Sequence, residues 1–498
     1  MDEAQATALN LEEAEAVIAA GGAGGRVIRG GTLRAGGYLV GTLAATAASV
    51  VLLRYLGVVD VGRYVTVMSL LAVAGGLADA GLTVIGQREY TVAGSPRGRR
   101  DVLGDVLAVR LVLAPLAVLA AALFAVLAGY DRTMVLGTLV GGIGIVIAAA
   151  TTTMTVPLST RLRLGAVTAI EVARQVVTAA ALAVLALAGA ALLPFFAVSI
   201  LSGLAALALA LVLVGAAGRV PPRFAPGAWR PLIAEAAPVA LALAASVLYV
   251  RGLVVLTSLL ASARQTGYFA TSFRLLEAFA AVSVLMIGSA FPVLAHAAAA
   301  DQERLASGLR RVAQVMLLVV LGIVLALVFG ARPIVRLLAG PGYGPAASVL
   351  QIQAFALIGG FMTQVWVTGL VAVRGQRALV LTNALALAAV VVFGFALIPP
   401  LGARGAAFAS VAGEAVLCLV TLAMLLRGRP ELRPGWGWAV RVAGAGAAGA
   451  LCGLLAPVGD AAAAIIAVAV FAAAALALNA VPRELFAALF RRPGVEGR

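Results

Sequence analysis

The sequence predicts an all-α, polytopic integral membrane protein with about 14 transmembrane helices. Of its 498 residues, 63% are hydrophobic and only 11% are charged, and the mean hydropathy is +1.09. A water-soluble fold of this composition would lack the polar surface needed to cover its core. Its apolar runs repeatedly reach the ~20 residues with which a helix crosses a bilayer, and they lack the alternation of barrel strands.

The apolar runs follow one another with short connections, so we expect no inserted soluble domain. The predicted spans are residues 35–56, 64–86, 104–128, 133–156, 167–190, 193–216, 232–260, 268–295, 312–331, 345–371, 378–398, 404–426, 438–457 and 460–481.

The distribution of arginine predicts the topology. All 36 basic residues are arginine, and the net charge is +15. If the N-terminus is cytoplasmic, 26 arginines, Arg110 among them, fall in inside segments, whereas 7 fall in outside segments. Cytoplasmic loops carry such an excess of basic residues. We therefore expect a multi-pass protein of the bacterial inner membrane with both termini cytoplasmic, and no nucleic-acid partner.

A weak internal repeat predicts the domain organisation. Residues 61–71 open the second span, and the similar residues 266–276 open the eighth. A repeat offset by six helices has a parallel orientation, as in transporters built from two lobes. The predicted parts are an acidic cytoplasmic tail (1–30), an N-lobe of helices 1–6 (31–218), a cytoplasmic linker (219–231), a C-lobe of helices 7–12 (232–426), helices 13–14 (427–482) and a basic cytoplasmic tail (483–498).

Three sets of residues resemble a known family in their order and spacing. The first is Arg54-Tyr55-Leu56-Gly57, Gly62-Arg63-Tyr64, Leu77-Ala78-Asp79-Ala80-Gly81-Leu82 and Arg88-Glu89. The second is Gly267-Tyr268, Arg274-Leu275-Leu276-Glu277 and Phe291-Pro292-Val293-Leu294-Ala295. The third is Gly342-Tyr343, Arg374-Gly375-Gln376-Arg377 and Pro399-Pro400-Leu401-Gly402-Ala403-Arg404-Gly405-Ala406-Ala407. Together they resemble polysaccharide flippases of the multidrug/oligosaccharidyl-lipid/polysaccharide (MOP) exporter superfamily, over roughly residues 30–430.

The resemblance implies twelve core helices in two lobes around a central cavity. It also implies a flippase that moves a lipid-linked oligosaccharide, a glycan on polyprenyl pyrophosphate, to the outer leaflet by alternating access, for cell-surface polysaccharide biosynthesis. The expected partners are membrane lipid, the lipid-linked glycan and the glycan polymerase or ligase machinery. We expect no cofactor, and the coupling ion, H⁺ or Na⁺, is left open.

Ionisable residues within the spans are the candidates for the site, because such groups are costly in a membrane and usually face a cavity or a partner. Arg251 and Arg274 are predicted to line the cavity and to hold the pyrophosphate, which a guanidinium contacts with two parallel hydrogen bonds. Glu277 would orient Arg274 or exchange a proton. The alternative is a structural Arg274–Glu277 pair, one helical turn apart, with Arg251 reaching out of the membrane.

Five other charged residues are candidates for gating or ion coupling: Asp79, Arg88, Glu171, Arg174 and Glu414. Each also has a structural interpretation, as an interfacial pair or a bond between helices. No catalytic residue is expected. The single His296 and the cysteines Cys418 and Cys452 predict neither a metal site nor a disulfide framework.

Three other functions stay open. A multidrug exporter of the same superfamily would need an acidic cavity for organic cations, whereas two arginines against one glutamate favour an anionic cargo. A membrane glycan polymerase or ligase would need a sizeable external loop with catalytic groups, which the sequence lacks. A membrane scaffold that transports nothing would not need charged residues within its spans.

Overall fold

The computed structural model describes residues 23–161, 163–215, 220–300, 302–373, 375, 377–433 and 437–481, and within these ranges the regular elements are helices. The predicted acidic tail is therefore described only from residue 23, and the predicted basic tail lies outside the described residues. The α-helices are α2 (Ala23–Asp79), α3 (Leu82–Val92), α4 (Pro96–Leu127), α5 (Arg132–Thr160), α6 (Leu164–Leu187), α7 (Leu192–Val214), α8 (Pro226–Leu260), α9 (Ala263–Ala300), α10 (Gln302–Leu338), α11 (Gly344–Gln353), α12 (Ala356–Ala372), α13 (Arg377–Leu401), α14 (Ala403–Gly428), α15 (Gly437–Leu455) and α16 (Asp460–Ala477).

The number of membrane spans agrees with the prediction. Twelve helices of the described residues are long and apolar enough to cross a membrane, and the bent pair α11–α12 makes a thirteenth span. One of the twelve, Leu43–Val92, contains the non-helical residue Gly57 (φ 73°, ψ 172°), where two helices join across a kink. The kink lies between the predicted spans 35–56 and 64–86, which this single candidate therefore covers together.

Two predicted spans are broken in the structure. The span predicted at 64–86 ends at Asp79 and resumes as α3, because Ala80 (φ 42°) and Gly81 (φ 72°) both have left-handed backbone. The span predicted at 345–371 is divided between α11 and α12, which meet at 42°. The sequence carries no strong signal for either break, since neither contains proline.

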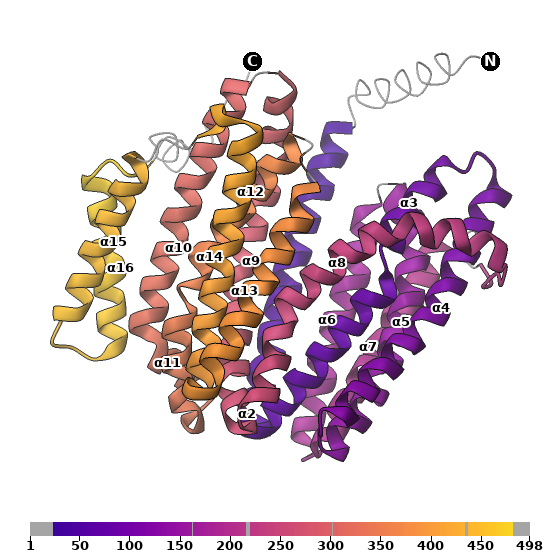
Figure 1. The fold of residues 1–498 in the computed structure, drawn as a ribbon, viewed down its shortest axis with the longest axis horizontal. Helices are drawn as coiled ribbons and strands as arrows, with labels where there is room; N and C mark the ends of the chain where they lie inside the picture. Colours follow the sequence, from indigo (N-terminus) through magenta and orange to yellow (C-terminus); the bar gives the residue numbers. More distant parts are fainter. Residues whose placement is uncertain are drawn as a thin grey trace.

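The helices form two groups with a peripheral pair. Figure 1 shows α3–α7 together on one side, which we call the N-terminal group, and α9–α14 on the other, the C-terminal group. The two groups approach each other where α2 turns back and lean apart at the other end. Helix α8 starts against α3 and α4 and later packs on α9 and α13, so it crosses between the groups. Helices α15 and α16 pack on α10 at the far edge.

The end of the molecule at which α2 turns, here called the Gly57 end, holds the two groups together. The Tyr343 hydroxyl donates to the carbonyl of Leu53 (2.7 Å), and the Arg54 guanidinium donates to the carbonyl of Leu337. Other contacts of this end involve Arg63 with Asp131 (2.9 Å) and Arg404 with Ser348 (3.0 Å). Arg54, Arg63 and Arg404 are among the seven arginines that fall in the predicted outside segments.

Two glycines of the internal repeat meet at this end. A Cβ atom on Gly62 would lie 2.8 Å from the backbone nitrogen of Gly267, and a Cβ on Gly267 would collide with the carbonyl of Val58. Only residues without a side chain permit this approach of α2 and α9. The repeated segments therefore form a direct contact between α2 and the C-terminal group.

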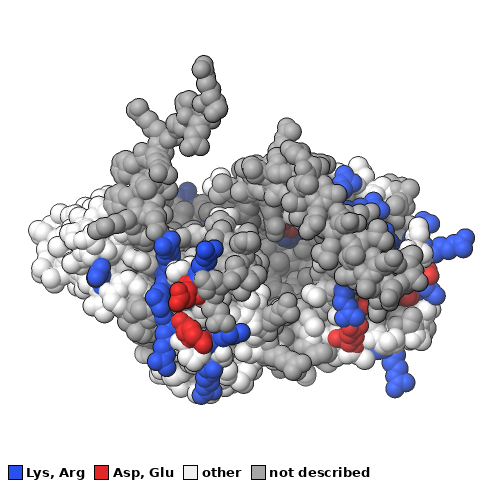
Figure 2. Space-filling view, turned by 90° about the horizontal axis from the view of Figure 1, so that it is seen from above, with Lys and Arg blue, Asp and Glu red and all other residues white. Residues whose placement is uncertain are grey.

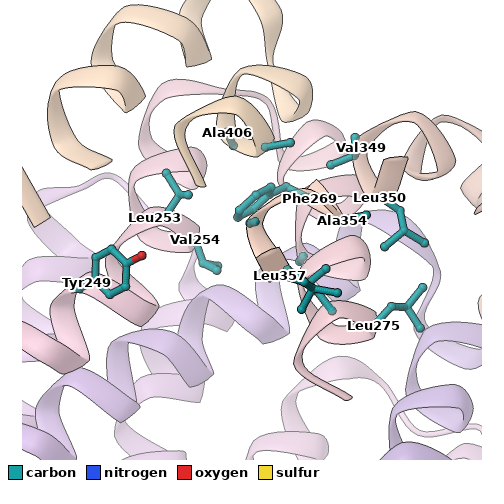
Figure 3. Packing of buried hydrophobic residues seen from close by; sticks show 14 of the residues in the cluster. Tyr249, Leu253, Val254, Phe269, Leu275, Val349, Leu350, Ala354, Leu357 and Ala406 are labelled. Atoms are coloured by element: carbon teal, nitrogen blue, oxygen red, sulfur yellow. The ribbon is translucent and has the colours of Figure 1, made fainter. Parts of the chain in front are cut away.

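A continuous apolar core lies behind this contact. Figure 3 shows Phe269 of α9 in the middle of it, between Leu253 and Val254 of α8 and the residues around Leu357 of α12. Phe269 and Val254 are fully buried. The core fixes α9 against α8, α11 and α12. It thereby fixes the positions of the charged residues of α8 and α9, which lie one to two turns farther from the Gly57 end.

Substituting Gly267 with alanine should destabilise the protein, because the added methyl group meets backbone that cannot rotate away. Overpacking of this kind costs about 1–3 kcal/mol. Gly252→Ala is the matched control, since a Cβ at Gly252 in α8 meets nothing within 4 Å. Thermal unfolding in detergent should give a lower Tm for Gly267→Ala and an unchanged or higher Tm for Gly252→Ala; equal values would contradict the close packing.

Candidate functional site

The centre of the candidate site is an ion pair within the membrane-spanning part of α8 and α9. The Arg251 guanidinium lies 2.9 Å from a carboxylate oxygen of Glu277, and its Cζ atom lies 5.6 Å from the centroid of the Phe273 ring. The Arg251 and Glu277 side chains are 30% and 34% exposed. The salt bridge and the cation–π contact together hold Arg251 against α9.

Arg274 lies on α9 one turn from Glu277 and is not held by an acid in the same way. Its Nε atom is buried and has no hydrogen-bond partner among the described residues. Arg274 interacts electrostatically with Tyr64, whose ring stacks on Phe196 (5.4 Å). Arg274 therefore faces the N-terminal group, and the alternative Arg274–Glu277 pair is replaced by a pair of Glu277 with Arg251.

The depth of these charges follows from their positions along the helices. Arg251 is nine residues before the end of α8, and Arg274 is eleven residues after the start of α9. At 1.5 Å per residue these distances are about 14 and 16 Å from the Gly57 end. Half of a hydrocarbon core is about 15 Å. Two arginines and one glutamate thus lie near the middle of the bilayer, with a net charge of +1.

A cavity of about 610 Å³ lies beside them within the C-terminal group. Its polar lining comes from α8, α9, α12, α13 and α14 and includes Ser246, Tyr249, Glu277, Gln364, Asn383, Ser410 and Glu414. Glu277 lines the cavity, whereas Arg251 and Arg274 do not belong to its lining.

Glu414 is the second acid of the cavity. Its carboxyl lies near the Tyr249 hydroxyl of α8, and its side chain lies over Gly359 and Gly360 of α12. A Cβ at Gly359 would come within 2.9 Å of Glu414, so a larger residue there would displace it. Sequence reasoning predicted either ion coupling or a bond between helices for Glu414. The structure places the carboxyl near α8 and also at the cavity wall.

Asp79 belongs to a buried network at the break between α2 and α3. Its carboxylate accepts hydrogen bonds from Arg110 and from the Thr83 hydroxyl (2.6 Å). Arg110 also donates to Thr83 (2.5 Å) and to Thr153 of α5 (2.9 Å), and its side chain is only 1% exposed. The assignment of Arg110 to an inside segment was wrong, because Arg110 is buried within α4. Its place inside the apolar run 104–128 was the signal that could have revealed this.

The other predicted gating residues lie at two separate places. Arg88 of α3 contacts Glu235 of α8 (2.5 Å) and the neighbouring Glu89 (3.2 Å). Glu171 and Arg174 form an exposed pair along α6 (2.5 Å). The structure thus does not bring the five candidates into one site. Figure 2, seen from the end opposite Gly57, shows arginines and acidic residues gathered on two sides of this face.

Sequence reasoning missed the aromatic partners of the site, namely Tyr64, Tyr249 and Phe273. Their contacts join helices that are far apart in the chain, so no local pattern indicates them. Among the described residues, no group of three or more His, Cys, Asp or Glu side chains is placed to hold a metal ion.

Comparison with known proteins identifies the family. A model of the polysaccharide biosynthesis protein family matches residues 27–298, which is more than half of the chain. The chain belongs to this family. No curated protein matches the sequence.

Solved structures with a similar fold are all distant in sequence. Lipid II flippase MurJ in an inward closed conformation has a TM-score of 0.75 at 11% identity, with 91% of this chain and 100% of MurJ covered. An inward-facing multidrug resistance MATE family transporter of the MOP superfamily has a TM-score of 0.62 at 14% identity, covering 78% and 94%. A MOP superfamily transporter from Pyrococcus furiosus has a TM-score of 0.56 at 15% identity, covering 82% and 95%.

These likenesses assign the fold. This member of the polysaccharide biosynthesis protein family is a multi-pass membrane protein with the MOP superfamily fold.

Proposed function

We propose that the protein is a flippase that moves a glycan on a polyprenyl pyrophosphate from the cytoplasmic to the outer leaflet by alternating access. The family description and the MurJ-like fold support a lipid-linked cargo. The arginine distribution supports cytoplasmic termini, with the Gly57 end outside. The cargo would then pass to polymerase or ligase machinery on the outer side.

The observation that carries the proposal is Arg274. A guanidinium keeps its charge at any accessible pH, so a place near mid-membrane, with the Nε atom buried, requires a compensating partner. Glu277 is already engaged by Arg251, and the Arg274 Nε has no partner among the described residues. A pyrophosphate would supply the missing negative charge and accept several hydrogen bonds at once. A cation would instead be repelled.

Arg251 and Glu277 have a supporting role in this proposal. Their pair leaves no excess charge, and the ring of Phe273 covers the guanidinium. An arriving phosphate would compete with Glu277 for Arg251. Arg274 lies one turn from Glu277 on the same helix, α9. The site therefore offers one free guanidinium and one that is exchangeable. This combination suits a cargo that has to be bound and then released.

Replacing Arg274 with alanine should reduce flipping of a fluorescent polyprenyl-pyrophosphate oligosaccharide in liposomes by about tenfold or more. A hydrogen bond to a charged group contributes roughly 1.5–3 kcal/mol, and 1.4 kcal/mol corresponds to a factor of ten. Arg174→Ala is the matched control, because Arg174 is already paired with Glu171 at an exposed position. Full activity of a folded Arg274→Ala protein would refute the assignment.

The acidic cavity in the C-terminal group favours a second function, the binding of a cation. Glu277 and Glu414 line it together with amides and hydroxyls, without an arginine. Such a lining suits a cation, either an organic cargo, as in a multidrug exporter, or the H⁺ or Na⁺ that drives transport. We place the coupling ion at Glu414, because the arginines that would bind the anionic glycan are not part of this lining.

If Glu414 binds the coupling ion, Glu414→Gln should abolish the stimulation of flipping by an imposed proton or sodium gradient. Flipping without a gradient should change little, and Glu171→Gln should keep the full response. Uptake of a fluorescent organic cation by the same vesicles would instead favour the exporter. A gradient response that survives in Glu414→Gln would exclude Glu414 as the ion site.

A further inference from the structure

The contact between α3 and the first half of α8 is built from parts of very unequal strength. Helix α3 has 11 residues, begins directly after the left-handed residues Ala80 and Gly81, and ends at Val92. One end of it is fixed by a buried network, and the other end carries an exposed ion pair to α8. A movement of the two groups of helices would break the weaker of these contacts.

The fixed end is the network around Asp79. Arg110 is almost completely buried and joins α2 to α4 and α5 through Asp79 and Thr153. Removing one partner of a buried pair typically costs about 3–5 kcal/mol, because the other charge is left uncompensated. The break at Ala80–Gly81 therefore stays attached to the N-terminal group.

The weak end is the pair of Arg88 with Glu235. These side chains are 59% and 41% exposed, and exposed ion pairs contribute only about 0–1 kcal/mol. Arg88 also lies 3.2 Å from Glu89 on its own helix. When Glu235 leaves, the charge of Arg88 therefore remains balanced. This contact can open at little cost.

The backbone between these two contacts is strained. Ala80 is a non-glycine residue with a φ of 42°, in the left-handed region that side chains disfavour. Gly81 packs so closely on α8 that a Cβ would lie 2.9 Å from Val239. The strain at Ala80 is relieved if α3 turns, and the close contact at Gly81 is lost only if α8 moves away.

The chain just before α8 has a separate and firmer attachment. The Arg223 backbone nitrogen donates to the carbonyl of Gly104 (3.0 Å), and its guanidinium contacts Asp101 (3.2 Å) and Asp105 (3.8 Å) of α4. The segment that precedes α8 is thus pinned to the N-terminal group. Beyond Arg223, Ala236 of α8 is buried in an apolar cluster with residues of α3 and α4, and the Arg88–Glu235 pair is the charged contact at the exposed edge of this packing.

We propose that Arg88 and Glu235 form a releasable latch, which attaches the first half of α8 to the hinged helix α3 and opens when the two groups change their relative position. Opening removes the charged contact between α8 and α3, while Arg223 and the Asp79–Arg110 network keep both elements attached to α4. The proposal rests on the proposed function, because it assigns the latch to one step of alternating access.

A reversible cross-link tests the latch. In a protein with Cys418→Ala and Cys452→Ala, the pair Arg88→Cys and Glu235→Cys is joined by a cleavable bifunctional maleimide. The matched control joins Asp101→Cys and Arg223→Cys, an exposed ion pair at the same end that lies before α8. The latch link should reduce flipping in liposomes at least tenfold, with recovery after cleavage, whereas the control link should leave flipping unchanged.

Hydrogen–deuterium exchange provides a readout that needs no cargo. The latch link should slow exchange of the α8 amides between Trp229 and Val247 at least tenfold, and the control link should not. If the latch link slows exchange but the unlinked protein does not flip the glycan, the latch is supported and the proposed cargo is refuted. Unchanged exchange, or full flipping in the linked protein, would overturn the latch.

Discussion

A guanidinium group cannot discard its charge inside a bilayer, and this constraint determines which arginines of the protein are structural and which are available for a ligand. Arg110 is compensated by Asp79 and two threonines and is buried in the N-terminal group. Arg251 is compensated by Glu277 and covered by Phe273. Arg274 lies at the same depth, but its Nε has no partner among the described residues. The proposed binding of an anionic cargo follows from this difference.

The two ends of the molecule differ in how the groups of helices are joined. At the Gly57 end the contact is backbone against backbone, through Gly62, Gly267 and Val58, and through carbonyls that accept hydrogen bonds from Tyr343 and Arg54. At the other end the groups lean apart, and α8 crosses between them. The contacts of α8 there combine close packing at Gly81 with an exposed ion pair. A transporter that opens its two ends in turn needs such contacts of moderate strength, because each has to form and break in every cycle.

Composition and the positions of the apolar runs were sufficient to predict the class of fold and the approximate number of spans. They could not predict the break at Ala80–Gly81, because Asp79 and Thr83, on either side of it, accept hydrogen bonds from Arg110 of another helix. Likewise, the spacing of Arg274 and Glu277 along one helix suggested a pair, but Arg251 from α8 takes that carboxylate. Local patterns determine which residues share a helix face. The choice among competing partners depends on how α8 and α9 cross, which is decided by the packing around Phe269.

The proposed binding of the cargo depends on a phosphate group as the partner of Arg274. The most direct test compares the binding of polyprenyl pyrophosphate with that of the uncharged polyprenyl alcohol of the same chain length, using the purified protein in detergent. The account predicts that the pyrophosphate binds at least tenfold more tightly and that added salt reduces this preference, since 1.4 kcal/mol corresponds to a factor of ten. Equal dissociation constants for the two lipids would contradict it.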